Sequence, residues 1–138
     1  MSRHFIVVAV ALAACERPDS VETAASKAEL ADSRAACVKL FQRQRACTDS
    51  FIPALVDVRR ELDRPSGISK APREEIISAA LEEWKSDSTD EAIVSTCDSK
   101  AGSMPAPAVA ESKRCVGLGA CGEFVTCVTP LLRQQLSR

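Results

Sequence analysis

Histidine and tyrosine are almost missing from the chain, which has one histidine, His4, and no tyrosine in 138 residues. Serine and cysteine nucleophiles of the familiar triad or dyad type use a histidine base, and no histidine follows position 4. No Cys-x-x-Cys pair occurs, which excludes thioredoxin-type redox motifs, haem attachment and the common zinc fingers. We therefore expect no metal, no cofactor and no enzymatic activity.

Other catalytic patterns are also weak. The carboxylate pairs Glu74-Glu75 and Glu82-Glu83 are neighbours in sequence, and successive side chains on a helix point about 100° apart. Such pairs cannot converge on one bond, so a solvated helix surface explains them better. The glycines over 117–122 match the letters G-x-G-x-x-G, but they follow no predicted strand, and the dinucleotide interpretation therefore fails.

Long apolar runs are missing as well. The longest, Phe5 to Ala14, is too short to span a bilayer as a helix, which needs about 20 apolar residues. It follows Arg3 and His4 and ends in small residues. A basic start, a short apolar core and small residues at its end are typical of a cleaved secretory signal.

The end of this run, Leu12-Ala13-Ala14-Cys15, resembles the lipobox of bacterial lipoproteins, which has an aliphatic residue and two small residues before a cysteine. The resemblance implies that the signal peptide, residues 1–14, is removed. It also implies that Cys15 then carries a diacylglycerol thioether and an acylated amino group. Two or more acyl chains make a stable membrane anchor. Residues 15–26 would form a lipidated tether and residues 27–138 the folded domain.

An alternative is a plain secreted protein that is cleaved near Ala13-Ala14 and keeps Cys15 as a thiol. If the lipobox interpretation holds, the protein belongs to the bacterial cell envelope. Glu16 follows the anchor cysteine; because Asp at that position favours inner-membrane retention in many diderm bacteria, Glu16 favours the outer membrane, facing the periplasm.

The chain also lacks a large excess of either positive or negative charge. Removing Arg3 with the signal leaves 17 basic residues against 19 acidic ones, a net charge of −2. Nucleic-acid binding needs a basic excess on one face, so we expect no nucleic-acid partner. The membrane, through the lipid, and a protein of the envelope are the expected partners.

Cysteine, by contrast, is abundant, with seven residues. Assigning Cys15 to lipid leaves an even number, which in an exported small domain predicts a disulfide framework. The six remaining cysteines allow three bridges and fifteen pairings: Cys37, Cys47, Cys97, Cys115, Cys121 and Cys127.

The cysteine spacings restrict these pairings. Cys37 and Cys47 lie about 15 Å apart along one helix, too far to bond each other. Cys115, Cys121 and Cys127 would point in three directions on one helix. Either they serve three neighbours, or the glycines between them break the helix and permit a local Cys115–Cys121 bridge. We favour bridges from the first helix to the last, with Cys97 in the same cluster. The nine-residue interval resembles twin Cys-x9-Cys proteins, which implies only disulfide-stapled antiparallel helices.

The apolar periodicity predicts an all-α fold, a small bundle of four to five helices stapled by up to three disulfides. Trp84 is expected to anchor the core. Ser88 and Glu91 suggest a capping box, Gly102 a helix end, and Pro130 a kink or break. The expected helices cover about 24–47, 52–62, 69–85, 88–102 and 107–136, the last weakened by glycines.

A secretion signal, a lipid anchor and a disulfide-stapled helical scaffold together predict a non-catalytic, lipid-anchored module for binding or assembly. An inhibitor or immunity-type lipoprotein is the main alternative, with the loop Gly102–Pro107 as the exposed contact. A thiol redox protein is a weaker alternative, because it requires an accessible, reactive thiol.

Overall fold

The computed structural model describes residues 26–138, which form six α-helices and one short 3-10 helix, with no strand within that range. The all-α class is confirmed, and the helix count is above the four to five expected. The helices are α1 (Lys27–Ala46), α2 (Thr48–Glu61), η1 (Ile68–Lys70), α3 (Arg73–Asp87), α4 (Asp90–Lys100), α5 (Ala106–Val116) and α6 (Cys121–Leu136).

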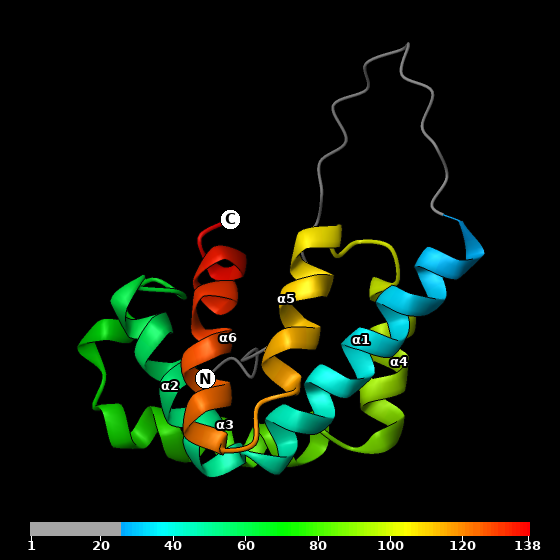
Figure 1. The fold of residues 1–138 in the computed structure, drawn as a ribbon. Helices are drawn as coiled ribbons and strands as arrows, with labels where there is room; N and C mark the ends of the chain where they lie inside the picture. The colour runs from blue at the N-terminus through cyan, green and yellow to red at the C-terminus, as the bar shows by residue number, and fades with distance from the viewer. Residues whose placement is uncertain (1–25) are drawn as a thin grey trace.

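The helices contact one another in a closed ring. α1 packs against α4 and α5, α5 against α6, α6 against α2, α2 against α3, and α3 against α4. Figure 1 shows α2 and α6 towards one end of the molecule and α1 and α4 towards the other, with α5 between them. In addition, α1 and α2 contact each other, and each helix buries one stripe against its neighbours and exposes the rest.

Trp84 on α3 belongs to the larger core cluster, as the sequence predicts, and lies near two other aromatic rings. Its ring lies 6.4 Å from that of Phe41 and 5.8 Å from that of Phe51, centroid to centroid. The indole Nε1 donates a hydrogen bond to Thr48 Oγ1 at 3.0 Å, so its one polar atom is satisfied. The largest fully buried apolar side chains are Phe124, Ile52, Ile93, Val56 and Val128, and all of them except Ile93 belong to the same cluster as Trp84.

The polar gap between the expected helices 24–47 and 52–62, Thr48-Asp49-Ser50, is wrong as a break, because α2 begins directly after Cys47. The Thr48 hydroxyl donates to the Arg45 carbonyl at 2.6 Å, while Asp49 lies in the first turn, where the helix dipole favours a negative charge. Polar residues that favour the first turn of a helix are also common in loops, so the sequence alone does not distinguish the two.

Two further helix starts differ from expectation. Thr89, not Ser88, caps α4, and its hydroxyl accepts from the Ala92 amide at 3.2 Å. Ser88 is buried, and its carbonyl accepts from Arg45 instead. The expected helix over 69–85 is η1 followed by α3, because the extended backbone of Ala71 and Pro72 separates the two elements.

The expected last helix, 107–136, is two helices that break at the glycines and not at Pro130. α5 ends at Val116 and α6 begins at Cys121, whereas α6 continues through Pro130. Pro130 is exposed, and so is Thr126, whose carbonyl loses its helical partner. Water can satisfy that carbonyl, which makes an interior proline tolerable here.

Gly102 ends the fourth helix as predicted. It follows the C-cap residue Ala101 and has φ of +80°, the left-handed region that favours glycine. A Cβ placed there would come within 2.7 Å of Leu30 Cδ2 on α1. A glycine at this position therefore permits both the positive φ of the turn and the close approach of α1.

Candidate functional site

The lipobox residues Leu12, Ala13, Ala14 and Cys15 lie outside the described residues, and so does the tether up to residue 25. Lipidation at Cys15 therefore stays a prediction. None of the described helices combines the length and the apolar character needed to cross a bilayer.

The six remaining cysteines form three disulfides, as predicted. Cys37 and Cys47 do not bond each other, and Cys47–Cys121 joins the end of the first helix to the start of the last. Cys97 bonds the first helix but lies in a separate, smaller cluster with Ile93. The bridges are Cys37–Cys97, Cys47–Cys121 and Cys115–Cys127.

The local bridge of the last region is Cys115–Cys127, so the Cys115–Cys121 alternative is wrong. The break between α5 and α6 turns the chain back, and Cys115 at the end of α5 then lies against the second turn of α6, where Cys127 stands. Their Cα atoms are 5.5 Å apart, within the range of a disulfide. The twin Cys-x9-Cys pattern is not formed, because Cys37 and Cys47 bond different helices.

A shallow, open groove follows this bridge. We call it the α5–α6 groove; its volume is about 630 Å³. Its wall combines apolar surface with three charged side chains and the Cys127 half of the disulfide. The lining residues are Glu111, Arg114, Leu118, Gly122, Glu123, Thr126, Cys127 and Pro130.

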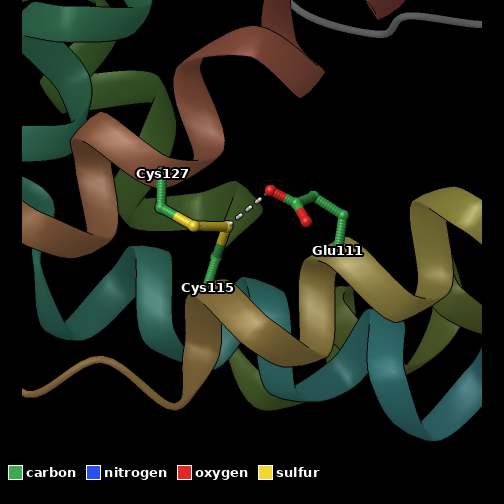
Figure 2. Close-up of side chains that lie close together, drawn as sticks. All are labelled: Glu111, Cys115 and Cys127. Carbon is green, nitrogen blue, oxygen red and sulfur yellow. Dashed lines mark hydrogen bonds between the residues drawn. A yellow bond between two sulfur atoms is a disulfide. The ribbon is translucent and has the colours of Figure 1, made fainter.

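Glu111 contacts both a charged residue of the groove, Arg114, and the Cys115–Cys127 disulfide. Its carboxylate accepts two hydrogen bonds from the Arg114 guanidinium, which lowers the pKa of Glu111. The same carboxylate lies 4.0 Å from Cys115 Sγ, and Figure 2 shows it directed at the bridge. The bridged sulfur carries no proton, so this approach is a contact and not a donated hydrogen bond.

Glu111, Cys115 and Cys127 each place one ligand atom within 4.8 Å of the others. Such a set is too small for a closed zinc site, and metals bind cysteine as the thiolate. The disulfide removes both thiolates, so the three residues do not fit a metal in this form.

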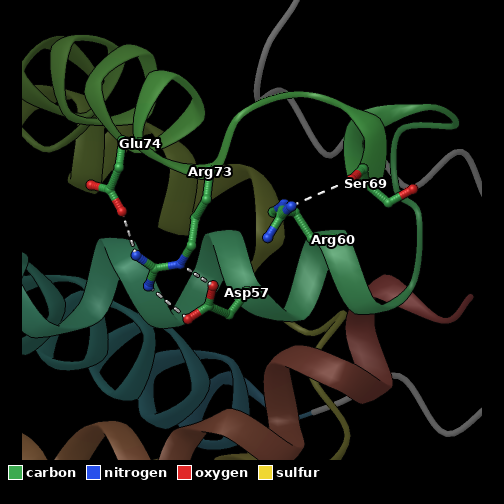
Figure 3. Close-up of polar contacts among 5 residues, drawn as sticks. All are labelled: Asp57, Arg60, Ser69, Arg73 and Glu74. Carbon is green, nitrogen blue, oxygen red and sulfur yellow. Dashed lines mark hydrogen bonds and ion pairs between the residues drawn. The ribbon is translucent and has the colours of Figure 1, made fainter.

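One carboxylate of the first acidic pair, Glu74, is engaged by Arg73. Arg73 binds both Asp57 oxygens, at 2.7 and 2.9 Å, and Glu74 at 2.8 Å (Figure 3). Arg73 and Asp57 are 38 % and 51 % exposed and Glu74 is 81 % exposed, and the pairing with Arg73 lowers the pKa of Asp57. The arrangement ties α3 to α2 and leaves Glu74 engaged in an ion pair.

The two carboxylates of the second acidic pair, Glu82 and Glu83, have different partners. Glu82 accepts from Lys85 at 2.6 Å on the surface, whereas Glu83 turns inward toward Arg59 on α2. Burial and the nearby Asp87 raise the pKa of Glu83, and burial lowers the pKa of Arg59. The attraction between the two charges offsets their burial only in part, because burial is the larger influence on both pKa values.

Arg43 on α1 binds the turn between α5 and α6, a contact that the sequence does not predict. Arg43 Nη2 donates to the carbonyls of Leu118 and Gly119, at 2.9 and 2.6 Å, and the guanidinium stacks over the Phe124 ring at 5.7 Å. The turn thus presents carbonyl oxygens to a cation, the opposite of a phosphate-binding loop. The contact forms because α5 packs against α1 and brings the turn that follows it to Arg43, so no local sequence pattern predicts it.

The expected contact loop Gly102–Pro107 is shorter than predicted, because α5 already begins at Ala106.

Comparison with known proteins identifies no relative: the chain matches no protein-family model, no curated protein and no solved structure.

Proposed function

We propose that the protein is a lipid-anchored protein of the bacterial envelope that acts as a non-catalytic module for binding or assembly. The observation that carries this proposal is the use of the cysteines. Six of the seven pair with one another, so none of them is a disulfide partner for Cys15, the residue that the lipobox assigns to lipid.

The scaffold supports a binding role. Three disulfides fix α1 to α4, α1 to α6 and α5 to α6, which limits the conformational entropy that a partner must remove on binding. Of the carboxylates in the two acidic pairs, Glu74 and Glu82 form ion pairs and Glu83 lies near Arg59. The α5–α6 groove combines apolar wall and charged rim, the composition of a small protein-binding surface.

The anchor is tested by expressing the full chain and Cys15→Ala in a bacterial host that processes lipoproteins. We expect the wild-type chain in the membrane fraction, with the mass of a lipidated chain that starts at Cys15. The Cys15→Ala chain should keep its signal uncleaved or leave the membrane unlipidated. Identical masses and fractionation for the two chains contradict the proposal.

The groove is tested separately with a photo-reactive amino acid placed at Thr126, inside the α5–α6 groove, in the membrane-bound protein. Glu91 on α4 is the matched control, because it is exposed and distant in the ring of helices. We expect one discrete covalent adduct from position 126 and none from position 91. Equal adducts from both positions, or none from either, contradict a partner at this groove.

A further inference from the structure

The cysteines of the three disulfides differ in exposure, because Cys47–Cys121 and Cys115–Cys127 each have one half-buried cysteine, Cys121 and Cys127. Both halves of Cys37–Cys97 are buried. Cys127 is half-buried and forms part of the α5–α6 groove, whereas its partner Cys115 is 0 % exposed. A nucleophile from solvent therefore reaches this bridge at Cys127, through a groove about 630 Å³ in volume.

Loop length distinguishes the same bridge. Cys115–Cys127 spans 12 residues, while Cys37–Cys97 and Cys47–Cys121 span 60 and 74. In the chain-entropy description, a short loop contributes least to the stability of the fold. The two long-range bridges would still hold α1 to α4 and α6 after the short one opens. The bridge at the groove is thus the one whose opening costs the fold least.

From these observations we propose that Cys115–Cys127 is a thiol-exchange site, at which an external dithiol attacks Cys127 Sγ from the groove. This inference goes beyond the binding role and does not depend on the lipid anchor. The reacting partner is defined by its chemistry: a dithiol that presents one thiolate on a segment narrow enough to enter the groove.

The exchange balances in two steps. The thiolate of the dithiol bonds to Cys127 Sγ, the Cys115–Cys127 bond breaks, and Cys115 leaves with the electron pair and takes a proton from solvent. The second thiol of the dithiol, as its thiolate, then attacks its own partner sulfur in the mixed disulfide. Cys127 is released and protonated, so two electrons and two protons pass from the dithiol to the protein.

Glu111 is placed to affect the leaving sulfur. Its carboxylate lies 4.0 Å from Cys115 Sγ, within reach of a thiol that donates to it (Figure 2). A negative charge there disfavours the leaving thiolate, and exchange slows when the leaving thiol has a higher pKa. Glu111 is therefore a positioning residue that favours the protonated Cys115 and restrains the rate of attack.

The first test is timed reduction of the folded, oxidised protein with a low concentration of dithiothreitol, followed by alkylation and mass spectrometry of each cysteine. We expect Cys115 and Cys127 to be labelled about tenfold faster than Cys47 and Cys121. Because Cys121 is also half-buried, the Cys47–Cys121 bridge is the matched control. Equal rates, or faster opening of the control bridge, overturn the proposal.

The second test identifies the attacked sulfur by adding glutathione disulfide to two variants. Cys115→Ser leaves the Cys127 thiol at the groove and should form the mixed disulfide readily. Cys127→Ser leaves the buried Cys115 thiol and should stay unmodified for as long as the chain is folded, as checked by circular dichroism. Equal modification of both folded variants overturns the assignment to Cys127.

The role of Glu111 is tested with Glu111→Gln in the disulfide-intact protein. Removing the charge, and releasing Arg114 toward the leaving sulfur, should speed the dithiothreitol reaction at Cys115–Cys127 several-fold and leave the Cys47–Cys121 rate unchanged. A purely structural role would alter both rates together, and an unchanged rate contradicts the assignment.

Discussion

Cys47 stands between α1 and α2 and is bonded to Cys121, the first residue of α6, across 74 residues of sequence. One covalent link therefore holds the ends of three helices at one corner of the ring. Its Cys47 half is part of the main core, since Cys47 is 3 % exposed and belongs to the cluster of Trp84 and Phe124.

Removing this bridge should cost more stability than removing the short one. In the chain-entropy description, Cys47–Cys121 contributes about 4.5 kcal/mol and Cys115–Cys127 about 3 kcal/mol. Paired serine variants of each bridge, unfolded in urea, measure the difference. The reverse order of the two losses is inconsistent with this account.

Gly102→Ala should destabilise the protein by about 1–3 kcal/mol, because an alanine is strained at positive φ and its Cβ meets Leu30 on α1. Gly119→Ala is the matched control: a Cβ there meets no atom within 4 Å among the described residues, and the change should be near zero. Thermal unfolding compares the two. Equal effects are evidence against the close approach of α1.

The Trp84–Thr48 hydrogen bond should be detectable through Thr48→Val. The valine keeps the shape of the side chain but leaves the buried indole N–H without its acceptor, at a cost of about 1–2 kcal/mol. Thr126→Val, on the exposed face of α6, should change the free energy of unfolding little. A neutral Thr48→Val variant means that water replaces the hydroxyl.

Asp63 should make stability depend on acid pH. Its carboxylate accepts from the Gly67 and Ser69 amides and the Ser69 hydroxyl, which lowers its pKa from 3.8 to about 2. Because the folded pKa is the lower one, this stabilisation is present above pH 3.8 and is lost as the pH falls toward 2.

The matched variant is Asp63→Asn, since asparagine tolerates the positive φ of this position. Thermal unfolding between pH 6 and pH 2 should show the wild-type protein more stable at pH 6 and the two proteins converging toward pH 2. A difference between them that stays constant with pH contradicts the assignment of the lowered pKa to Asp63.

Sequence patterns predicted the all-α class, because apolar stripes at helical spacing do not depend on the arrangement of the helices. Cysteine parity predicted three bridges, and helix geometry excluded Cys37–Cys47. The pairing itself required the break at Gly117–Ala120, which brings Cys115 to Cys127. Helix starts such as Thr48 were misread because capping residues and loop residues share the same chemistry.

The candidate site was less accessible to prediction. The α5–α6 groove depends on two helices that the sequence pattern predicts as one, and the contact of Glu111 with the disulfide depends on the turn between them. Arg43 reaches its carbonyl partners only because the chain returns to α1 after more than seventy residues. No local pattern encodes contacts of this kind.

The central claim, a disulfide scaffold anchored by lipid, is tested most directly by purifying the processed protein from membranes and alkylating it without reductant. Intact-mass and peptide spectra then give the state of every cysteine. We predict a chain that begins at Cys15, carries acyl chains there, and has its other six cysteines blocked as three disulfides. A Cys15 that labels as a free thiol, on a chain without lipid, contradicts the claim.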